Sequence, residues 1–196
     1  AAVLGANDGI VSTAAVVVGV AGATLHPFPI LTAGIAGLTA GALSMAVGEY
    51  VSVSAQRDTE KALLETERRE LAEMPDEELS ELAGLYEQKG LDAELARQVA
   101  EQLHAHDALA AHAETELGID PAALTNPWVA AASSAISFTI GSLLPLLAII
   151  LAPAELKIPV TVAAVAAALV LTGYLSARAG GTPVLRAIGR NVTGGL

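Results

Sequence analysis

Asp8 and Glu49 stand at the two ends of a tract, residues 9–48, that contains no charged residue, and Met45 lies four residues before Glu49. Helical spacing of i and i+4 places Met45 and Glu49 on one helix face. A carboxylate at membrane depth is costly unless it faces a cavity, a partner or a cation, so these positions predict an ion pathway. A thioether beside carboxylates favours a softer transition-metal ion over Ca²⁺ or Mg²⁺. The alternative is that Asp8 caps a helix, Glu49 hydrogen-bonds at the membrane surface and Met45 only packs.

A second group of metal-ligating side chains lies in the charged middle of the chain. Carboxylates three residues apart, and a histidine and a glutamate four residues apart, fall on one face of a helix. Two such helices meeting at Pro75 would present four carboxylates to one or more cations. The pairs are Glu67 with Glu70, Glu78 with Glu81, and His112 with Glu116. Glutamate-rich helices are more often simply solvated faces, so the spacing alone leaves that alternative open.

Three more candidate ligands, His104, His106 and Asp107, crowd into four residues. Residues two apart point in different directions on a regular helix, so we expect a surface role for this group. The chain has no cysteine, and any metal site must therefore use oxygen, nitrogen or thioether donors.

The composition describes two environments in one chain. Hydrophobic residues make up 53% and charged residues only 16%, which is unusual for a soluble globule. The net charge of −11 comes from charges crowded between Arg57 and Asp120. Nucleic-acid binding needs a basic stripe, and this cluster has the opposite sign, so that class is excluded.

The apolar tracts are long enough to cross a membrane, which takes about 20 helical residues. Residues 9–48 accommodate two spans joined by a turn at Pro27 and Pro29, and residues 128–154 and 158–177 make a second hairpin. Four spans result. Residues 184–196 begin another helix that is too short to cross. Glycines at 34, 37 and 41 predict close helix packing and would also suit a dimer interface.

The charged interval between the hairpins predicts two or three soluble helices. Met74 and Pro75 interrupt the first, Asp76 is a candidate cap for the second, and a long third helix runs from Asp92 to Gly118. Basic residues follow the second and fourth spans, which places this interval in the cytoplasm by the positive-inside rule. They are Arg57, Lys61, Arg68, Arg69, Arg178, Arg186 and Arg190.

The predicted fold is therefore an all-α polytopic membrane protein, a transmembrane helical bundle with an inserted cytoplasmic helical domain. Residues 1–55 form a transmembrane hairpin, 56–125 an acidic metal-binding domain, 126–179 a second hairpin and 180–196 the start of a truncated fifth span. No basic leader with a cleavage pattern precedes the first span, so a signal peptide is not predicted.

Two motifs are specific in sequence, spacing and order. The first is Gly-Ala-Asn-Asp-Gly from Gly5 to Gly9, and the second is Ser-Met-Ala-Val-Gly-Glu-Tyr-Val-Ser from Ser44 to Ser52. With the glutamate-rich insert between the hairpins, they resemble the vacuolar iron transporter (VIT) family over almost the whole chain. The resemblance implies a homodimer with five spans per subunit that exports cytosolic Fe²⁺, and often Mn²⁺, in exchange for protons. It also implies that the pathway runs between the subunits.

The resemblance assigns roles by position. Asp8 and Met45 match the family's membrane metal-binding residues, and Glu49 lies in the same motif. His112 stands where plant relatives tend to have methionine. The residues that match the cytoplasmic metal-binding carboxylates are Glu67, Glu70, Glu78, Glu81 and Glu116. The metal is then a substrate, and no prosthetic group is expected.

Two other functions are alternatives to metal transport. A membrane-anchored ferritin-like ferroxidase would need the Glu-x-x-His motifs of a di-iron bundle, and Glu101 with His104 supplies only one. A membrane scaffold without transport would leave the carboxylates as solvating groups. We expect no enzyme activity, partners limited to a second copy, lipid, metal ions and protons, and a location in a bacterial plasma membrane, or a vacuolar membrane if the source is eukaryotic.

Overall fold

The structure is a computed structural model that describes residues 2–195. Every regular element in this range is a helix and no strand occurs there, which confirms the all-α prediction. The helices gather into two compact units. The membrane unit holds the residues up to Val51 and those from Pro127 onward, and the acidic unit holds residues 52–126.

Four helices are long and apolar enough to cross a membrane, which confirms the predicted number of spans within the described range. Proline fixes its own φ and lacks an N–H group, so it is favoured in the first turn of a helix, where Pro27 and Pro127 stand. A short 3₁₀ helix, η2 (Ala154–Leu156), joins the second hairpin. The four helices are α1 (Ala2–Ala23), α2 (Pro27–Glu73), α5 (Pro127–Leu151) and α6 (Lys157–Gly180).

One helix, α2, contains both the second span and the first helix of the acidic unit. Its 47 residues make it about 70 Å long, whereas the hydrocarbon layer is about 30 Å thick. Only its apolar part, up to Val51, can lie within the bilayer. The charged remainder, which includes Glu67, belongs to the acidic unit.

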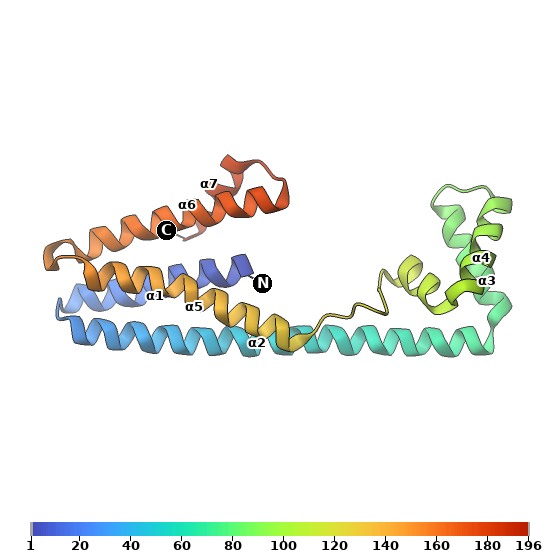
Figure 1. The fold of residues 1–196 in the computed structure, drawn as a ribbon, viewed down its shortest axis with the longest axis horizontal. Helices are drawn as coiled ribbons and strands as arrows, with labels where there is room; N and C mark the ends of the chain where they lie inside the picture. Colours follow the sequence, from blue (N-terminus) through green and yellow to red (C-terminus); the bar gives the residue numbers. More distant parts are fainter. Residues whose placement is uncertain (1, 196) are drawn as a thin grey trace. The chain divides into compact units, whose positions relative to one another are not determined.

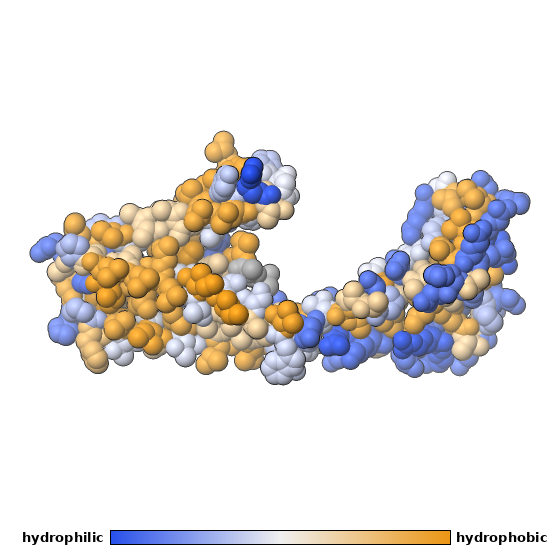
Figure 2. Space-filling view, viewed as in Figure 1, coloured by the Kyte–Doolittle hydropathy of each residue, from blue (hydrophilic) through white to orange (hydrophobic). Residues whose placement is uncertain are grey.

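The core of the membrane unit forms where α1 meets α5 and α6, which lie side by side in Figure 1. Val17, Leu146 and Ile149 pack with Ile30 of α2, and Leu169 of α6 packs against Ile10. Large apolar side chains also cover the outside of this unit, which is mostly orange in Figure 2. An apolar exterior of this kind suits a lipid environment.

A further helix, α7 (Val184–Gly195), follows α6 and packs against it, with Ile188 beside Gly173. Its 12 described residues are fewer than the roughly 20 that a span needs. The segment that the sequence identifies as the start of a fifth span is thus helical over this length.

Several glycines of the spans pack within the chain. A Cβ atom on Gly34 would collide with Leu146, and one on Gly41 would collide with the ring of Phe138. On Gly9 and Gly141 a Cβ would collide with backbone atoms of the neighbouring helix. The close packing predicted from small residues is therefore used between α1, α2 and α5.

Gly141→Ala is expected to force α1 and α5 apart, because the added methyl group meets the carbonyl oxygen of Ala6, which cannot rotate away. Overpacking of this kind destabilises by about 1–3 kcal/mol, so the thermal unfolding temperature in detergent should fall. Gly19→Ala is the matched control, because nothing lies within 4 Å of the added atom there. Equal unfolding temperatures for the two variants would contradict the packing argument.

The acidic unit contains the end of α2, α3 (Pro75–Gln88), α4 (Ala93–His112) and a π-helical turn, η1 (Ala113–Leu117). The prediction that Asp76 caps α3 is wrong. Met74 occupies the cap position and Pro75 the first helical position, so Asp76 lies inside the first turn. The predicted start at Asp92 is confirmed, because Asp92 is the N-cap of α4 and its Oδ1 accepts a hydrogen bond of 3.0 Å from the N–H of Leu95.

The long helix predicted from Asp92 to Gly118 is broken once. Asp107 has the extended values φ −157° and ψ 94°, and its Oδ1 accepts a 3.0 Å hydrogen bond from the N–H of Ala110. A side chain that accepts from the backbone three residues on is the signature of a new helix start. The element ends as predicted at Gly118, whose φ of 65° suits glycine.

Candidate metal-binding sites

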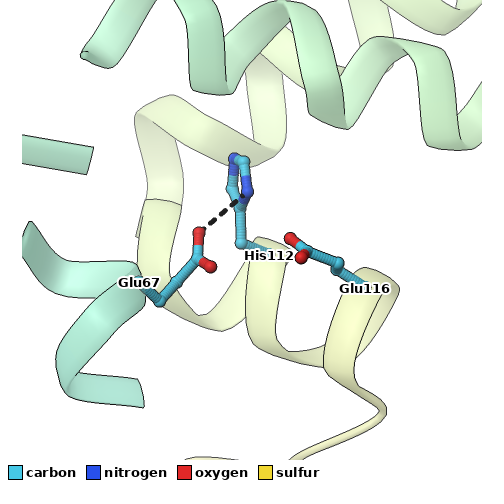
Figure 3. Close-up of side chains that lie close together, drawn as sticks. All are labelled: Glu67, His112 and Glu116. Carbon is cyan, nitrogen blue, oxygen red and sulfur yellow. Dashed lines mark ion pairs between the residues drawn. The ribbon is translucent and has the colours of Figure 1, made fainter. Parts of the chain in front are cut away.

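Three potential ligands from three elements converge in the acidic unit (Figure 3). Glu67 comes from α2, His112 from the end of α4 and Glu116 from η1. One ligand atom of each lies within 4.8 Å of the others. Two carboxylates and an imidazole at this separation can share one divalent transition-metal ion.

Burial makes this cluster unlike an ordinary acidic surface. His112 is 0% exposed, Glu67 is 4% exposed and Glu78 is 6% exposed. Nδ1 of His112 lies 3.0 Å from Oε1 of Glu67 and 3.6 Å from Oε2 of Glu78. The structure thus brings Glu78 to the same histidine as the other two carboxylates. Buried charges need a partner or a metal, and the carboxylates here outnumber the histidine.

The electrostatics of the cluster raise the pKa values of its carboxyl groups. Burial, followed by the negative charges of Glu116, Glu78, Glu70 and Glu81, raises the pKa of Glu67 to about 7. Burial and neighbouring carboxylates also raise the pKa values of Glu78 and Glu116. Like charges crowded in a desolvated site disfavour the ionised form, and a bound cation would reverse that.

His112 is in the form that binds metals. Burial, followed by the charge of His104, lowers its pKa, so the imidazole is neutral near pH 7. Nε2 of His112 is buried without a hydrogen-bond partner within residues 2–195, and Nδ1 of His112 and Oε1 of Glu67 meet at 3.0 Å without hydrogen-bond geometry. Buried polar atoms are nearly always satisfied, and a shared cation would satisfy these.

Packing of the acidic unit supports the cluster. Leu82, Ala83 and Ala100 form an apolar core between α3 and α4. The hydroxyl groups of Tyr86 and Thr115 lie 3.2 Å apart and tie α3 to η1, one residue before Glu116. The π-helical turn is therefore anchored next to its ligand.

Glu70 and Glu81 surround the cluster without joining it. Glu70 is half-buried and Glu81 is exposed, whereas their partners in the predicted pairs, Glu67 and Glu78, are buried. The charges of Glu70 and Glu81 act on Glu67 through space. Each predicted pair thus places one carboxylate inside and one toward solvent.

In the membrane unit, Asp8 of α1 and Met45 of α2 line the same two cavities, of about 400 and 170 Å³. The larger cavity also contains Asn7, Asn191 and Arg190, and the smaller one contains Ser44. A carboxylate and a thioether facing one space are an oxygen and a sulfur donor for a transition-metal ion. The structure thus brings Asp8 and Met45 to the same cavities.

A polar network beside this cavity was not visible in the sequence. Thr172 of α6 donates a 2.7 Å hydrogen bond to Oδ1 of Asn7, and Nδ2 of Asn191 donates to the Thr172 hydroxyl at 3.4 Å. It joins α1, α6 and α7 and fixes the residue that precedes Asp8. Asn7 is an evident polar residue in an apolar helix, but nothing in the pattern links it to Thr172, which is 165 positions away.

Glu49 lines neither of these cavities and is half-buried near the end of the second span. The next residue, Tyr50, packs on Trp128 with ring centroids 4.7 Å apart. Tyrosine and tryptophan gather where a membrane meets water, so this pair marks that boundary. Glu49 thus follows Met45 by about one turn of α2, next to this aromatic pair, but does not line the cavities that Asp8 and Met45 share.

The fold defines an integral, multi-pass helical membrane protein, and side chains of types that can bind metal lie among its spans and in an inserted acidic unit. The sequence profile of the VIT family matches residues 1–196. The chain belongs to the VIT family, as the resemblance predicted.

Curated relatives carry matching names. A protein of Acanthamoeba castellanii named vacuolar iron transporter is 49% identical over 147 residues, which are 75% of this chain and 53% of the relative. Vacuolar iron transporter homolog 5 of Oryza sativa subsp. japonica is 36% identical over 100% of this chain and 72% of its own length. Homolog 3 of Arabidopsis thaliana is 34% identical, covering 100% and 74%. The match thus spans about half the length of the Acanthamoeba castellanii protein.

Proposed function

We propose that this protein moves Fe²⁺ out of the cytosol across a membrane in exchange for protons, with Mn²⁺ and other divalent transition metals as further substrates. Membership of the VIT family and the names of the relatives support metal transport. The observation that carries the proposal is the pair Asp8 and Met45, which line two common cavities of the membrane unit. Metal is the substrate and no prosthetic group is needed.

The acidic unit is proposed to lie in the cytoplasm and to collect ions. Of the chain's 21 acidic residues, 18 lie in residues 52–126, so this unit produces a strong negative field. Such a field raises the local concentration of cations. The cluster of buried Glu67 and His112 with exposed Glu116 then selects transition metals from the collected ions.

The membrane step is proposed to take place between two copies of the chain. Asp8 and Met45 supply only two donors, fewer than a divalent transition-metal ion takes. Asp8 is exposed on the single chain and is thus accessible to a second copy. Two copies related by symmetry would supply two carboxylates and two thioethers. When the ion leaves, a proton can take its place on Asp8, which couples export to proton entry.

An enzymatic role is not proposed. The Glu-x-x-His pair that a ferroxidase would use is Glu101 with His104, and Glu101 instead forms an exposed ion pair of 2.8 Å with Arg97. Such a surface contact leaves it outside any buried di-iron site.

Flux in proteoliposomes tests the proposal directly. Vesicles loaded with a fluorescent metal chelator are expected to take up Fe²⁺ faster when their lumen is more acidic than the outside, and a protonophore should remove that advantage. Vesicles without protein give the background. Fe²⁺ uptake that ignores the proton gradient would rule out exchange, and uptake at the background rate would rule out transport.

Metal binding at the acidic unit is expected to weaken as the pH falls below about 7. Above the raised pKa of Glu67 the carboxylate is free, whereas below it each incoming ion must displace a proton. One displaced proton lowers the apparent affinity by about tenfold per pH unit. Calorimetric titration with Co²⁺ in two buffers of different ionisation enthalpy measures both the affinity and the proton release. Equal affinities at about pH 6 and pH 8 would contradict the assignment of Glu67 as a ligand.

A further inference from the structure

His104 lies beside the buried cluster, so the prediction of a surface role for it is wrong. Its ring centroid is 5.9 Å from that of His112, with the ring planes at 74°. The side chain is half-buried, and Nδ1 is fully buried without a hydrogen-bond partner in the described part of the chain. His106, two residues on, is exposed as predicted.

The break at Asp107 explains how the two histidines meet. Eight residues of regular helix advance by about 12 Å, which would hold these rings more than two turns apart. Because Asp107 leaves the helical conformation and starts a new helix, the chain changes course between His104 and His112. The break at Asp107 therefore brings the imidazole of His104 next to that of His112.

Unsatisfied nitrogens at this point need an explanation. Nε2 of His112 and Nδ1 of His104 are buried without hydrogen bonds within residues 2–195, and each such atom costs about 1–3 kcal/mol, whereas Nδ1 of His112 faces Oε1 of Glu67 at 3.0 Å. A metal ion is bound by imidazole nitrogen at about 2.1 Å, so two rings on one ion have centroids about 5–6 Å apart. The observed 5.9 Å falls in that range.

We propose that His104 is a further ligand of the ion held by Glu67, His112 and Glu116. The inference rests on the proposed function, because it takes this cluster to be the place where the transported metal is collected. Two imidazoles beside carboxylates form a donor set that favours Fe²⁺, Co²⁺ and Zn²⁺ over Mn²⁺, since imidazole suits the later ions and carboxylate suits Mn²⁺. His104 thus sets the metal preference of the acidic unit.

Equilibrium dialysis of the 196-residue chain in detergent tests this preference with Co²⁺ and Mn²⁺. His104→Ala is expected to lower the affinity for Co²⁺ by at least about tenfold and that for Mn²⁺ by less than about threefold. His106→Ala is the matched control and should bind both metals like the wild type. No change in His104→Ala, or an equal loss for both metals, would overturn the proposal.

A measurement on the wild-type protein keeps the test independent of how well the variant folds. Pulsed electron paramagnetic resonance with one equivalent of Cu²⁺ counts the imidazoles on the ion, and we expect two. A single imidazole in the wild type would overturn the assignment.

The failure of this inference can be told apart from failure of the proposed function. If Glu67→Gln binds Co²⁺ like the wild type, the cluster is not a metal site, and both the role of His104 and the proposed collecting role of the acidic unit fall, whereas proteoliposome flux still decides transport. If Glu67→Gln loses binding while His104→Ala retains both the affinity and the preference, only the role of His104 is wrong.

Discussion

Asp8→Ala is expected to reduce metal flux by at least about 100-fold while leaving metal binding by the acidic unit unchanged. Loss of an outer-shell partner of a metal ligand already costs about 10–100-fold, and Asp8 is proposed to contact the ion itself. Asp8 and Met45 line the same cavities, so removing the carboxylate leaves one thioether as the donor from this chain. A thioether without charge holds a divalent ion poorly.

Two further variants serve as comparisons for Asp8→Ala. Asp58→Ala removes an exposed carboxylate of the acidic unit and should transport at close to the wild-type rate. Met45→Leu keeps the size and apolar character of the side chain but removes the sulfur. We expect it to retain part of the flux and to lose Fe²⁺ transport more than Mn²⁺ transport.

Fe²⁺ uptake into proteoliposomes with an acidic lumen is the measurement, with Co²⁺ binding at equilibrium as the check on folding. Wild-type flux in Asp8→Ala would remove Asp8 from the pathway and with it the proposed membrane site. A loss of both flux and Co²⁺ binding would show misfolding, and Asp8→Asn, which has nearly the same shape, would then decide.

The membrane architecture could be predicted because the physics that sets it is local. A bilayer demands about 20 apolar residues per helix, and the chain contains four such stretches separated by proline or polar turns. The uninterrupted course of α2 was not predicted, although no glycine or proline occurs between Gly48 and Pro75. The cap at Asp92 and the end at Gly118 follow from single residues.

The break at Asp107 could not be predicted from the same kind of signal. No proline or glycine stands near it, and an aspartate inside a helical pattern is more often simply exposed. Its side chain accepts a hydrogen bond from the N–H of Ala110, a local alternative to continuing the helix that aspartate offers but the sequence pattern does not require. The position of His104 was misjudged because it depends on this break.

Spacing also could not tell which carboxylate of each pair is buried. Residues three apart share a helix face but differ by about 60° in direction, enough to place Glu67 and Glu78 inside and Glu81 in solvent. Which one turns inward depends on how α2, α3 and η1 pack together. The link from Asn7 to Thr172 and Asn191 is likewise a product of tertiary packing.

Glu67→Gln is expected to weaken metal binding by at least about 100-fold and, at the same time, to stabilise the metal-free protein at about pH 8. The amide keeps the shape of the side chain but carries no charge to hold a cation. The substitution nevertheless raises the free energy of unfolding of the metal-free protein, because the wild-type carboxylate is ionised at that pH in a desolvated, negatively charged site.

The pH range follows from the raised pKa. Glu67 titrates at about 7 when folded and near 4.5 when unfolded, so its stabilising contribution is complete below the lower value and lost as the pH rises through the upper one. One pKa unit corresponds to about 1.4 kcal/mol, and we expect Glu67→Gln to gain about 1–3 kcal/mol at about pH 8. Near about pH 5 the wild-type carboxyl is neutral when folded, and the advantage should shrink.

Thermal unfolding in detergent with a chelator, at both pH values, measures this difference. Glu65→Gln is the matched control, because Glu65 lies two residues earlier on α2, is largely exposed and pairs with Arg68 at 3.2 Å. It should change neither metal binding nor stability by much, since surface ion pairs contribute at most about 1 kcal/mol. If Glu67→Gln destabilised the metal-free protein at high pH, Glu67 would be a structural partner of His112. Stabilisation together with lost metal binding would show that Glu67 binds the ion and destabilises the protein when the ion is absent.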